Sequence, residues 1–291
     1  MRLCAYPDHI AIENNLQDRF LETIYGHAIG RFLIRPLIQP ACSQLAGRLL
    51  DSPISSALVR PFVLANHISL KECEKQNFHS YNDFFTRRLK PDARRLSPNP
   101  EDLVSPCDAR LMIYPVTADG RFQIKHTSYT LSKLLKDSRL AQRFEGGTLF
   151  LFRLSVDDYH RYIYVDDGIR SSERKIPGVL HTVNPAANDH IPIYKENCRE
   201  YTLQKSRHFG TFIQMEVGAM MVGKIKNANG SESRISVKRG EEKGFFAFGG
   251  STILLITQRG TVIPDPRILS YSIQGIETRV LQGETIGTSG K

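Results

Sequence analysis

The sequence has no apolar run long enough to cross a membrane. Its most apolar N-terminal stretch, residues 29–38, is interrupted by two arginines and a proline and falls well short of the roughly 20 apolar residues that a membrane-spanning helix needs. Asp8 and Glu13 stand where a secretory signal would carry its apolar segment, so we expect no export signal. The chain can therefore lie on a membrane but should not cross one.

Cysteine is scarce, and several common catalytic motifs are missing. The five cysteines are an odd number, widely spaced and without a C-x-x-C pair, which argues against a disulfide framework or a structural zinc site and suits a reducing cytoplasm. There is no G-x-x-x-x-G-K-[ST] loop, strand-linked G-x-G-x-x-G, H-E-x-x-H pair or G-x-S-x-G elbow, so nucleotide-dependent, metal-dependent and protease functions lack support. Zinc-finger, helix-turn-helix and RNA-recognition spacings are missing too, and we expect no nucleic-acid partner.

Acidic residues are outnumbered. The 291 residues include 39 Lys and Arg against 30 Asp and Glu, which leaves a formal net charge of +9. Such a surface favours acidic partners, among them anionic lipids and phosphorylated substrates. The 41% of hydrophobic residues is typical of a folded protein and excludes a disordered chain.

The N-terminal quarter has a helical pattern. Between about residues 12 and 75, apolar residues recur at spacings of three and four, and prolines divide the region into short helices. Asp51 is the only acidic residue between Ile24 and Leu70. The arginines of this stretch are Arg31, Arg35, Arg48 and Arg60. A basic amphipathic layer can lie in a membrane interface, although spacing alone favours packing against the protein's own core.

After Pro91 the pattern changes to that of strands. Short apolar or alternating segments with Gly or Pro nearby are typical of β-structure, and the clearest are residues 149–156, 210–217 and 245–256. One helix, over residues 131–144, should interrupt them, with Thr130 as its N-cap. Another is expected at residues 82–89, where Ser80 and Asp83 resemble a capping box.

The sequence therefore predicts an α+β fold, in which a β-rich body follows a layer of short amphipathic helices. We place the helical region at residues 1–77 and the β-rich domain at residues 78–291.

Glycines and a serine interrupt the apolar strand pattern at one place. Gly249, Gly250 and Ser251 lie between an aromatic and an aliphatic strand segment. Glycine within a strand usually marks a bulge or a close backbone approach. The alternative interpretation is that Ser251 is a nucleophile beside a peptide bond that Gly250 leaves accessible.

Two further segments carry groups for proton transfer. Asp108 follows a Ser-Pro turn, and Asp158 and His160 lie with Asp157 and Arg161 at the end of a predicted strand. Each alone is most often a structural hydrogen-bonding residue. With Ser251 they supply the ingredients of a Ser–His–Asp arrangement.

Six motifs, in one order, resemble those of the phosphatidylserine decarboxylases. They are Y-N-D-F-F-T-R-R-L-K-P at residues 81–91, S-P-C-D at 105–108, D-Y-H-R at 158–161, G-V-L-H-T-V-N-P at 178–185, V-G-A-M-M-V-G-K-I at 217–225 and K-R-G-E-E-K-G-F-F-A-F-G-G-S-T at 238–252. One such motif would be weak evidence, but six in this order are specific.

The resemblance implies a self-cleaving, pyruvoyl-dependent decarboxylase domain. Ser251 would attack the carbonyl of Gly250, and elimination would leave a pyruvoyl group, derived from Ser251, on the second of two associated chains. This group would form a Schiff base with the amine of phosphatidylserine and act as electron sink while CO2 leaves. Neither a metal nor a nucleotide would be needed. Asp108 would orient the base that accepts the Ser251 proton.

The sequence departs from the family pattern at two positions. The family usually continues D-Y-H-R-x-H, and the second histidine is the better candidate for the base of cleavage, but Ile163 occupies that position here. Ala109 replaces the glycine after the turn aspartate. The nearest histidines carried by motifs are His160 and His181, so we expect one of them to serve instead.

An anionic lipid substrate gives the basic helical layer a function, which is to dock peripherally on the cytoplasmic face of the cell membrane. Two alternatives stay open. The protein could be a pyruvoyl decarboxylase of a soluble amino acid, or, because of Ile163, an uncleaved lipid-binding relative without catalysis.

Overall fold

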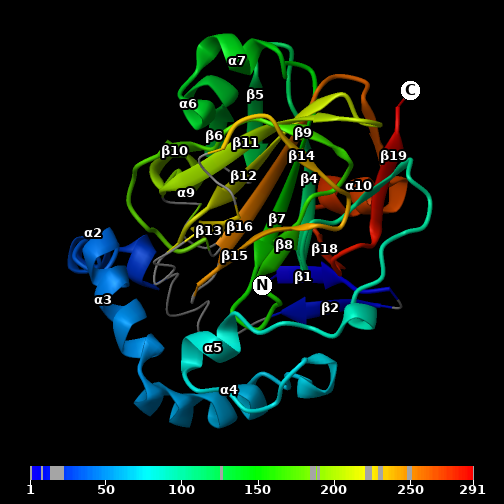
Figure 1. Cartoon of the computed structure of the whole chain (residues 1–291). Helices are drawn as coiled ribbons and strands as arrows, with labels where there is room; N and C mark the ends of the chain where they lie inside the picture. The colour runs from blue at the N-terminus through cyan, green and yellow to red at the C-terminus, as the bar shows by residue number, and fades with distance from the viewer. Residues whose placement is uncertain are drawn as a thin grey trace.

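The fold is known from a computed structural model. It describes residues 2–7, 9–13, 23–124, 127–183, 188, 191–219, 225–228, 232–247 and 251–290. The chain is mixed α/β and rich in strands, with many of its helices in the N-terminal part (Figure 1). This confirms the predicted fold class. The division at residue 77 stays a prediction.

A large sheet forms the centre of the described part of the molecule. Its strands run in the order β14 (Ile235–Val237), β9 (Gly168–Arg170), β11 (Arg199–Ser206), β12 (Thr211–Val217), β16 (Ser251–Thr257), β7 (Thr148–Leu154), β4 (Ala109–Pro115), β18 (Glu277–Val280), β1 (Arg2–Ala5) and β2 (Ile10–Glu13), while β10 (Arg174–Ile176) also pairs with β11. Most neighbours are antiparallel, and β1 and β18 run parallel.

Smaller sheets and short helices complete the body. The sheets are β13 (Ile225–Asn227), β15 (Glu242–Phe246) and β8 (Arg161–Ile163); β17 (Val262–Pro264), β19 (Thr285–Ser289) and β3 (Asp102–Val104); and β5 (Arg121–Ile124) with β6 (Thr127–Thr130). The helices are α6 (Leu131–Leu135), α7 (Ser138–Gln142), α9 (Ile193–Glu196) and α10 (Pro266–Ile273).

Both faces of the large sheet are buried. Side chains alternate between the faces along each strand. One set, including Leu149, Leu151 and Leu254, packs with residues of β5, β6, α6 and α7. The other set, including Phe152 and Ile253, packs with residues of β8, β15 and β19. Strands buried on both faces read as continuous apolar runs, which is why the sequence marked these segments clearly.

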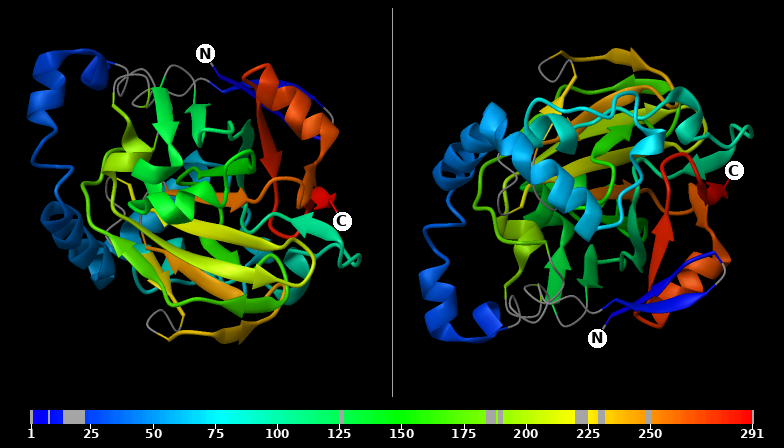
Figure 2. Two further views of the ribbon diagram at one scale, coloured as in Figure 1. Left: turned by 90° about the horizontal axis from the view of Figure 1, so that it is seen from above. Right: turned by 90° about the horizontal axis from the view of Figure 1, so that it is seen from below.

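The N-terminal helices form a separate layer along one side of the body (Figures 1 and 2). They are α2 (Ala28–Leu33), α3 (Pro40–Asp51), η1 (Pro53–Leu58), α4 (Val59–Ala65), η2 (Leu70–Glu72), α5 (Tyr81–Phe85) and η3 (Pro91–Ala93). An aromatic cluster centred on Phe84 joins α4 to α5, with Phe62, Phe78 and Tyr81 packed edge-on against its ring.

The first residues differ from the helical prediction. Residues 2–5 and 10–13 form β1 and β2, which extend the large sheet beside α10 (Figure 2). Four-residue strands carry too few residues for their period of two to stand out from the neighbouring helical spacing. Residues 14–22 lie outside the described residues.

Other element predictions hold with shifted bounds. Thr130 and Ser80 both accept the expected capping hydrogen bonds, from the backbone N–H of Lys133 and of Asp83. The single helix expected at residues 131–144 is wrong, because Lys136 adopts a left-handed conformation with φ 53° and separates α6 from α7.

Replacing Phe84 tests the aromatic cluster that joins α4 to α5 within the layer. Phe84→Ala should lower the free energy of unfolding by about 3–5 kcal/mol, because it leaves a cavity in a fully buried cluster. Urea unfolding, monitored by circular dichroism or by tyrosine fluorescence because the chain has no tryptophan, measures this change. Phe32→Ala, at a ring that is 65% exposed, is the control and should change stability by less than about 0.5 kcal/mol. Equal effects of the two variants would contradict the described packing.

Candidate functional site

Ser251 is the first residue of β16, in the middle of the large sheet. It pairs with Leu154 at the end of β7, and its side chain is fully buried. Its hydroxyl has no hydrogen-bond partner among the described residues. Buried polar groups are nearly always satisfied, and the Thr252 hydroxyl beside it is buried without a partner in the described residues as well. What distinguishes Ser251 as a candidate nucleophile is its place directly after the Gly-Gly pair. The predicted scissile partner, Gly250, lies outside the described residues.

Asp108 immediately precedes β4 and is held in a fixed orientation. Its carboxylate accepts hydrogen bonds from Arg94 Nε at 2.8 Å, from Arg94 Nη2 at 2.6 Å and from the backbone N–H of Gln282 at 2.9 Å. Only β7 separates β4 from β16, so the two strands lie about 10 Å apart. The structure thus brings Asp108 to the same end of the sheet as Ser251, without a hydrogen bond between them.

His160 lies in the segment that leads into β8. The imidazole is fully buried, with Nδ1 2.9 Å from the carbonyl oxygen of Asp158 and its ring centroid 4.0 Å from that of Phe85. Its carbonyl oxygen accepts a hydrogen bond from Phe246 N at 3.0 Å. Because Phe246 ends the strand before the Gly-Gly-Ser segment, His160 is tied to the approach to Ser251.

His181 occupies the other side of this sheet end. Its backbone is joined through the Asn197 side chain to the carbonyl oxygen of Gly218, which follows β12, the other neighbour of β16. His181 is buried, with 6% of the residue exposed, and its Nδ1 has no hydrogen-bond partner among the described residues. Burial lowers the pKa of His181, which favours a neutral imidazole able to accept a proton, and its Nε2 lies 3.6 Å from Glu196 Oε2.

Ile163 places a hydrocarbon side chain, which cannot accept a proton, where the family pattern has a histidine. The side chain is buried, its backbone N–H donates to Pro106 O at 3.0 Å, and its carbonyl accepts from Gln214 Nε2 at 3.3 Å. The position therefore lies close to the Asp108 turn, but with a hydrocarbon side chain.

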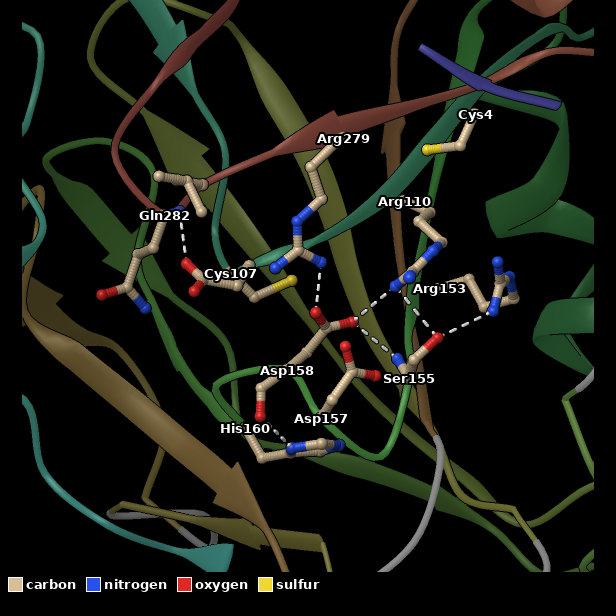
Figure 3. A network of polar contacts seen from close by, with 12 residues as sticks. Cys4, Cys107, Arg110, Arg153, Ser155, Asp157, Asp158, His160, Arg279 and Gln282 are labelled. Carbon is tan, nitrogen blue, oxygen red and sulfur yellow. Dashed lines mark hydrogen bonds and ion pairs between the residues drawn. The ribbon is translucent and has the colours of Figure 1, made fainter. Parts of the chain in front are cut away.

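Asp158 is the centre of an ion-pair network that the sequence did not reveal (Figure 3). Its carboxylate pairs with Arg279 and with Arg110 at 3.3 Å, and accepts from the Ser155 N–H at 2.7 Å. Burial alone would raise the pKa of Asp158, but Arg279 and Arg110 outweigh it and lower the pKa. Asp158 therefore stays ionised although it is fully buried.

The two arginines belong to a row across the sheet. Strand register places Thr252, Arg153, Arg110 and Arg279 next to one another on adjacent strands. Arg153 Nε donates to Glu277 at 2.7 Å, which neutralises the third arginine. The signal in the sequence was a charged residue within an apolar strand, since such residues are rarely buried unless paired.

A second buried ion pair lies on the Ser251 face of the sheet. Glu216 on β12 is in register with Ile253 and therefore shares a face with Ser251. Its Oε1 accepts a hydrogen bond from Lys243 Nζ at 2.6 Å, and both side chains are at most 1% exposed. Burial raises the pKa of Glu216 to about 7, although Lys243 opposes the shift. Sequence analysis missed this pair, because β12 and β15 belong to different sheets and only tertiary packing brings the two side chains together.

Two features are absent from the described residues. No group of three or more His, Cys, Asp or Glu side chains there could hold a metal ion. No helix in that part of the chain is long and apolar enough to span a membrane.

Comparisons with known proteins agree on one family. The family profile described as phosphatidylserine decarboxylase matches residues 81–288. The phosphatidylserine decarboxylase proenzyme 2 of Clostridium acetobutylicum is 40% identical over 279 residues, covering 96% of this chain and 94% of the relative. The phosphatidylserine decarboxylase proenzyme of Ruminiclostridium cellulolyticum is 41% identical over 281 residues, covering 95% and 93%. The chain therefore belongs to the phosphatidylserine decarboxylase family.

Proposed function

We propose that this protein decarboxylates phosphatidylserine to phosphatidylethanolamine at a membrane surface, using a pyruvoyl group that it makes by cleaving itself between Gly250 and Ser251. The observation that carries the proposal is the buried, unpartnered hydroxyl of Ser251 at the start of a central strand. Family membership supports the substrate, since the relatives are phosphatidylserine decarboxylase proenzymes.

Cleavage uses only the atoms of this segment and water. Ser251 Oγ adds to the Gly250 carbonyl carbon, and the C–N bond breaks to give an ester and a free amine. A base then removes the Ser251 Cα proton, the Cβ–Oγ bond breaks, and the Gly250 carboxylate leaves. The dehydroalanine that remains tautomerises, and water displaces ammonia to give the pyruvoyl group. Once formed, that group supplies a carbonyl that withdraws electrons while CO2 leaves.

His181 is the proposed proton acceptor in place of the histidine lost at Ile163. Its support is a neutral ring with an unpartnered Nδ1, on the element joined to Gly218. The Nδ1 of His160, in contrast, lies against the carbonyl of Asp158, so we assign His160 to positioning the segment before the cleavage site. Asp108 is proposed to fix the turn through Arg94 and Gln282.

The two chains should stay associated after cleavage. Strands β16, β18 and β19 follow the cleavage site, and each pairs with at least one strand that precedes it. β16 has such a partner on both sides, β12 and β7. Separating the chains would therefore require breaking the central sheet.

The N-terminal layer supports docking on a membrane. Large apolar side chains on α2, α3, η1 and α4 are solvent-exposed, and monomers rarely leave so many uncovered without a partner. They are Ile29, Phe32, Leu33, Leu45, Leu49, Ile54, Leu58 and Leu64. Arg35, Arg48 and Arg60 are exposed among them, while Arg31 instead donates to Tyr25 O at 2.6 Å. An apolar face with arginines can bind an anionic lipid surface. An enzyme that acts on a soluble amino acid has no need of such a face, so the face favours a lipid substrate.

Cleavage is tested first. The purified protein should separate in a denaturing gel into residues 1–250 and residues 251–291, and co-elute under native conditions. Ser251→Ala should give one uncleaved chain without decarboxylase activity, because it lacks the nucleophile. Thr252→Val, which removes the neighbouring hydroxyl from the opposite face of β16, is the control and should still cleave. A wild-type protein that stays in one piece would favour the lipid-binding alternative.

The histidines are separated by cleavage kinetics. His181→Ala should slow self-cleavage by about 10²–10⁴-fold, which is the usual contribution of a general base, and Ile163→His should restore part of the rate in that background. Intact mass against time after translation measures this. His79→Ala, at an exposed histidine outside the site, should cleave normally. Normal cleavage of His181→Ala would refute the assignment and make Glu216→Gln the next variant to measure.

Membrane docking is measured by vesicle sedimentation. Binding to phosphatidylserine-containing vesicles should exceed binding to neutral ones and weaken with salt, because headgroup charge contributes. Ile54→Ser combined with Leu64→Ser should reduce binding at least tenfold, since each buried aliphatic side chain is worth about 1.5–3 kcal/mol. Ile169→Ser, at an exposed isoleucine of β9, should leave binding unchanged. Equal binding to both vesicle types at low salt would refute the electrostatic contribution.

A further inference from the structure

A polar cavity of about 190 Å³ lies where the N-terminal layer meets the ion-pair network. One wall is the segment 66–69, directly after α4, and the other walls carry charged side chains from three of the six motifs, from residues beside them and from β18. They are Arg87, Arg94, Asp108, Asp157, Asp158 and Arg279. The volume corresponds to about six water molecules, which is room for a phosphate group and a short amine.

Most of these charges neutralise one another. Arg94 pairs with Asp108 at 2.6 Å and with the more exposed Glu72 at 3.0 Å, and Arg279 pairs with Asp158. Among the described residues, two charged groups of the cavity form no ion pair, the guanidinium of Arg87 and the carboxyl group of Asp157.

Arg87 is a buried cation that no carboxylate of the described residues pairs with. The residue is 5% exposed, its Nη2 donates to the carbonyl oxygens of Asp157 and Asp158, both at 3.3 Å, and its guanidinium lies over the Phe84 ring, 4.9 Å from the centroid. Its Nη1 has no hydrogen-bond partner among the described residues. The nearby Cys73 thiol supplies no counter-charge, because burial raises its pKa and keeps it neutral. A buried guanidinium is costly unless an anion pairs with it, so this atom indicates a missing anionic ligand.

Asp157 presents the complementary charge. No described side chain hydrogen-bonds to its carboxyl group or forms an ion pair with it, and Figure 3 shows it beside Asp158 without a contact of its own. Burial, followed by repulsion from Asp158, raises the pKa of Asp157. A cation bound in the cavity would favour its ionised form.

The cavity also adjoins the apolar face that is proposed to enter the membrane. Its wall at residues 66–69 follows Leu64, which is 67% exposed and belongs to the apolar face proposed to enter the membrane. A headgroup lies just outside the acyl region in which such side chains insert.

We propose that this cavity binds the phosphate and amine of a phospholipid headgroup, with the phosphate oxygens on Arg87 and the ammonium group on Asp157. The inference rests on the proposed function, because it names where the lipid is held before its amine reaches residue 251. It adds two positioning residues, one for each charge.

Binding can be measured without any catalysis. The Ser251→Ala protein is titrated with glycerophosphoethanolamine, glycerol 3-phosphate and inorganic phosphate, with calorimetry or ligand-observed NMR as readout. Arg87→Gln should weaken binding of the first two ligands about tenfold or more, the size expected for a lost charge-assisted hydrogen bond. Asp157→Asn should weaken only glycerophosphoethanolamine. Arg88→Gln, at the neighbouring arginine whose side chain is 60% exposed, is the matched control and should weaken neither.

The outcomes are decisive in either direction. Equal binding by Arg87→Gln and Arg88→Gln, or no binding of any ligand, overturns the proposal. Inorganic phosphate that binds as tightly as glycerophosphoethanolamine, with no effect of Asp157→Asn, overturns the amine half of it. Where Arg87→Gln does not fold, Arg87→Lys and the near-isosteric Asp157→Asn carry the test. In the cleaved enzyme the same variants should raise KM for phosphatidylserine more than they lower kcat, whereas failure of the proposed function would remove activity and leave headgroup binding intact.

Discussion

Three arginines lie side by side on adjacent strands where solvent hardly reaches, and Asp158 makes this arrangement tolerable. Like charges in register repel, and burial removes the water that would screen them. Asp158 pairs with both Arg110 and Arg279 and also accepts the Ser155 N–H, while Glu277 pairs with Arg153. One carboxylate thereby fixes the segment after β7 onto β4 and β18. Because His160 and Asp157 belong to that segment, their positions depend on the same contacts.

The same constraint links the Ser251 end of the sheet to the helical layer. Arg87, near the end of α5, donates to the carbonyls of Asp157 and Asp158, and the ring of Phe85 lies against His160. A short helix thus contacts both the aromatic cluster of the layer and the segment of the site. Docking the layer on a membrane would place these groups at a fixed depth relative to the lipid.

Sequence reasoning recovered what local spacing encodes. Caps at Ser80 and Thr130, strands buried on both faces and the exceptional Gly-Gly-Ser segment all leave a signal within a few residues. It could not recover what depends on the pairing and packing of distant strands. Glu216 on β12 and Lys243 on β15 belong to different sheets, and only the packing of one sheet against the other brings them together. Nor could it recover β1, whose parallel partner β18 lies at the opposite end of the chain.

The position of β16 imposes an order of events. β16 has a neighbour on each side, so the surroundings that bury Ser251 exist only once residues 251–257 are paired into the sheet. In the proposed self-cleavage, folding would therefore come first and peptide-bond chemistry second, and the intact precursor would serve as the scaffold on which its two pieces are fitted together.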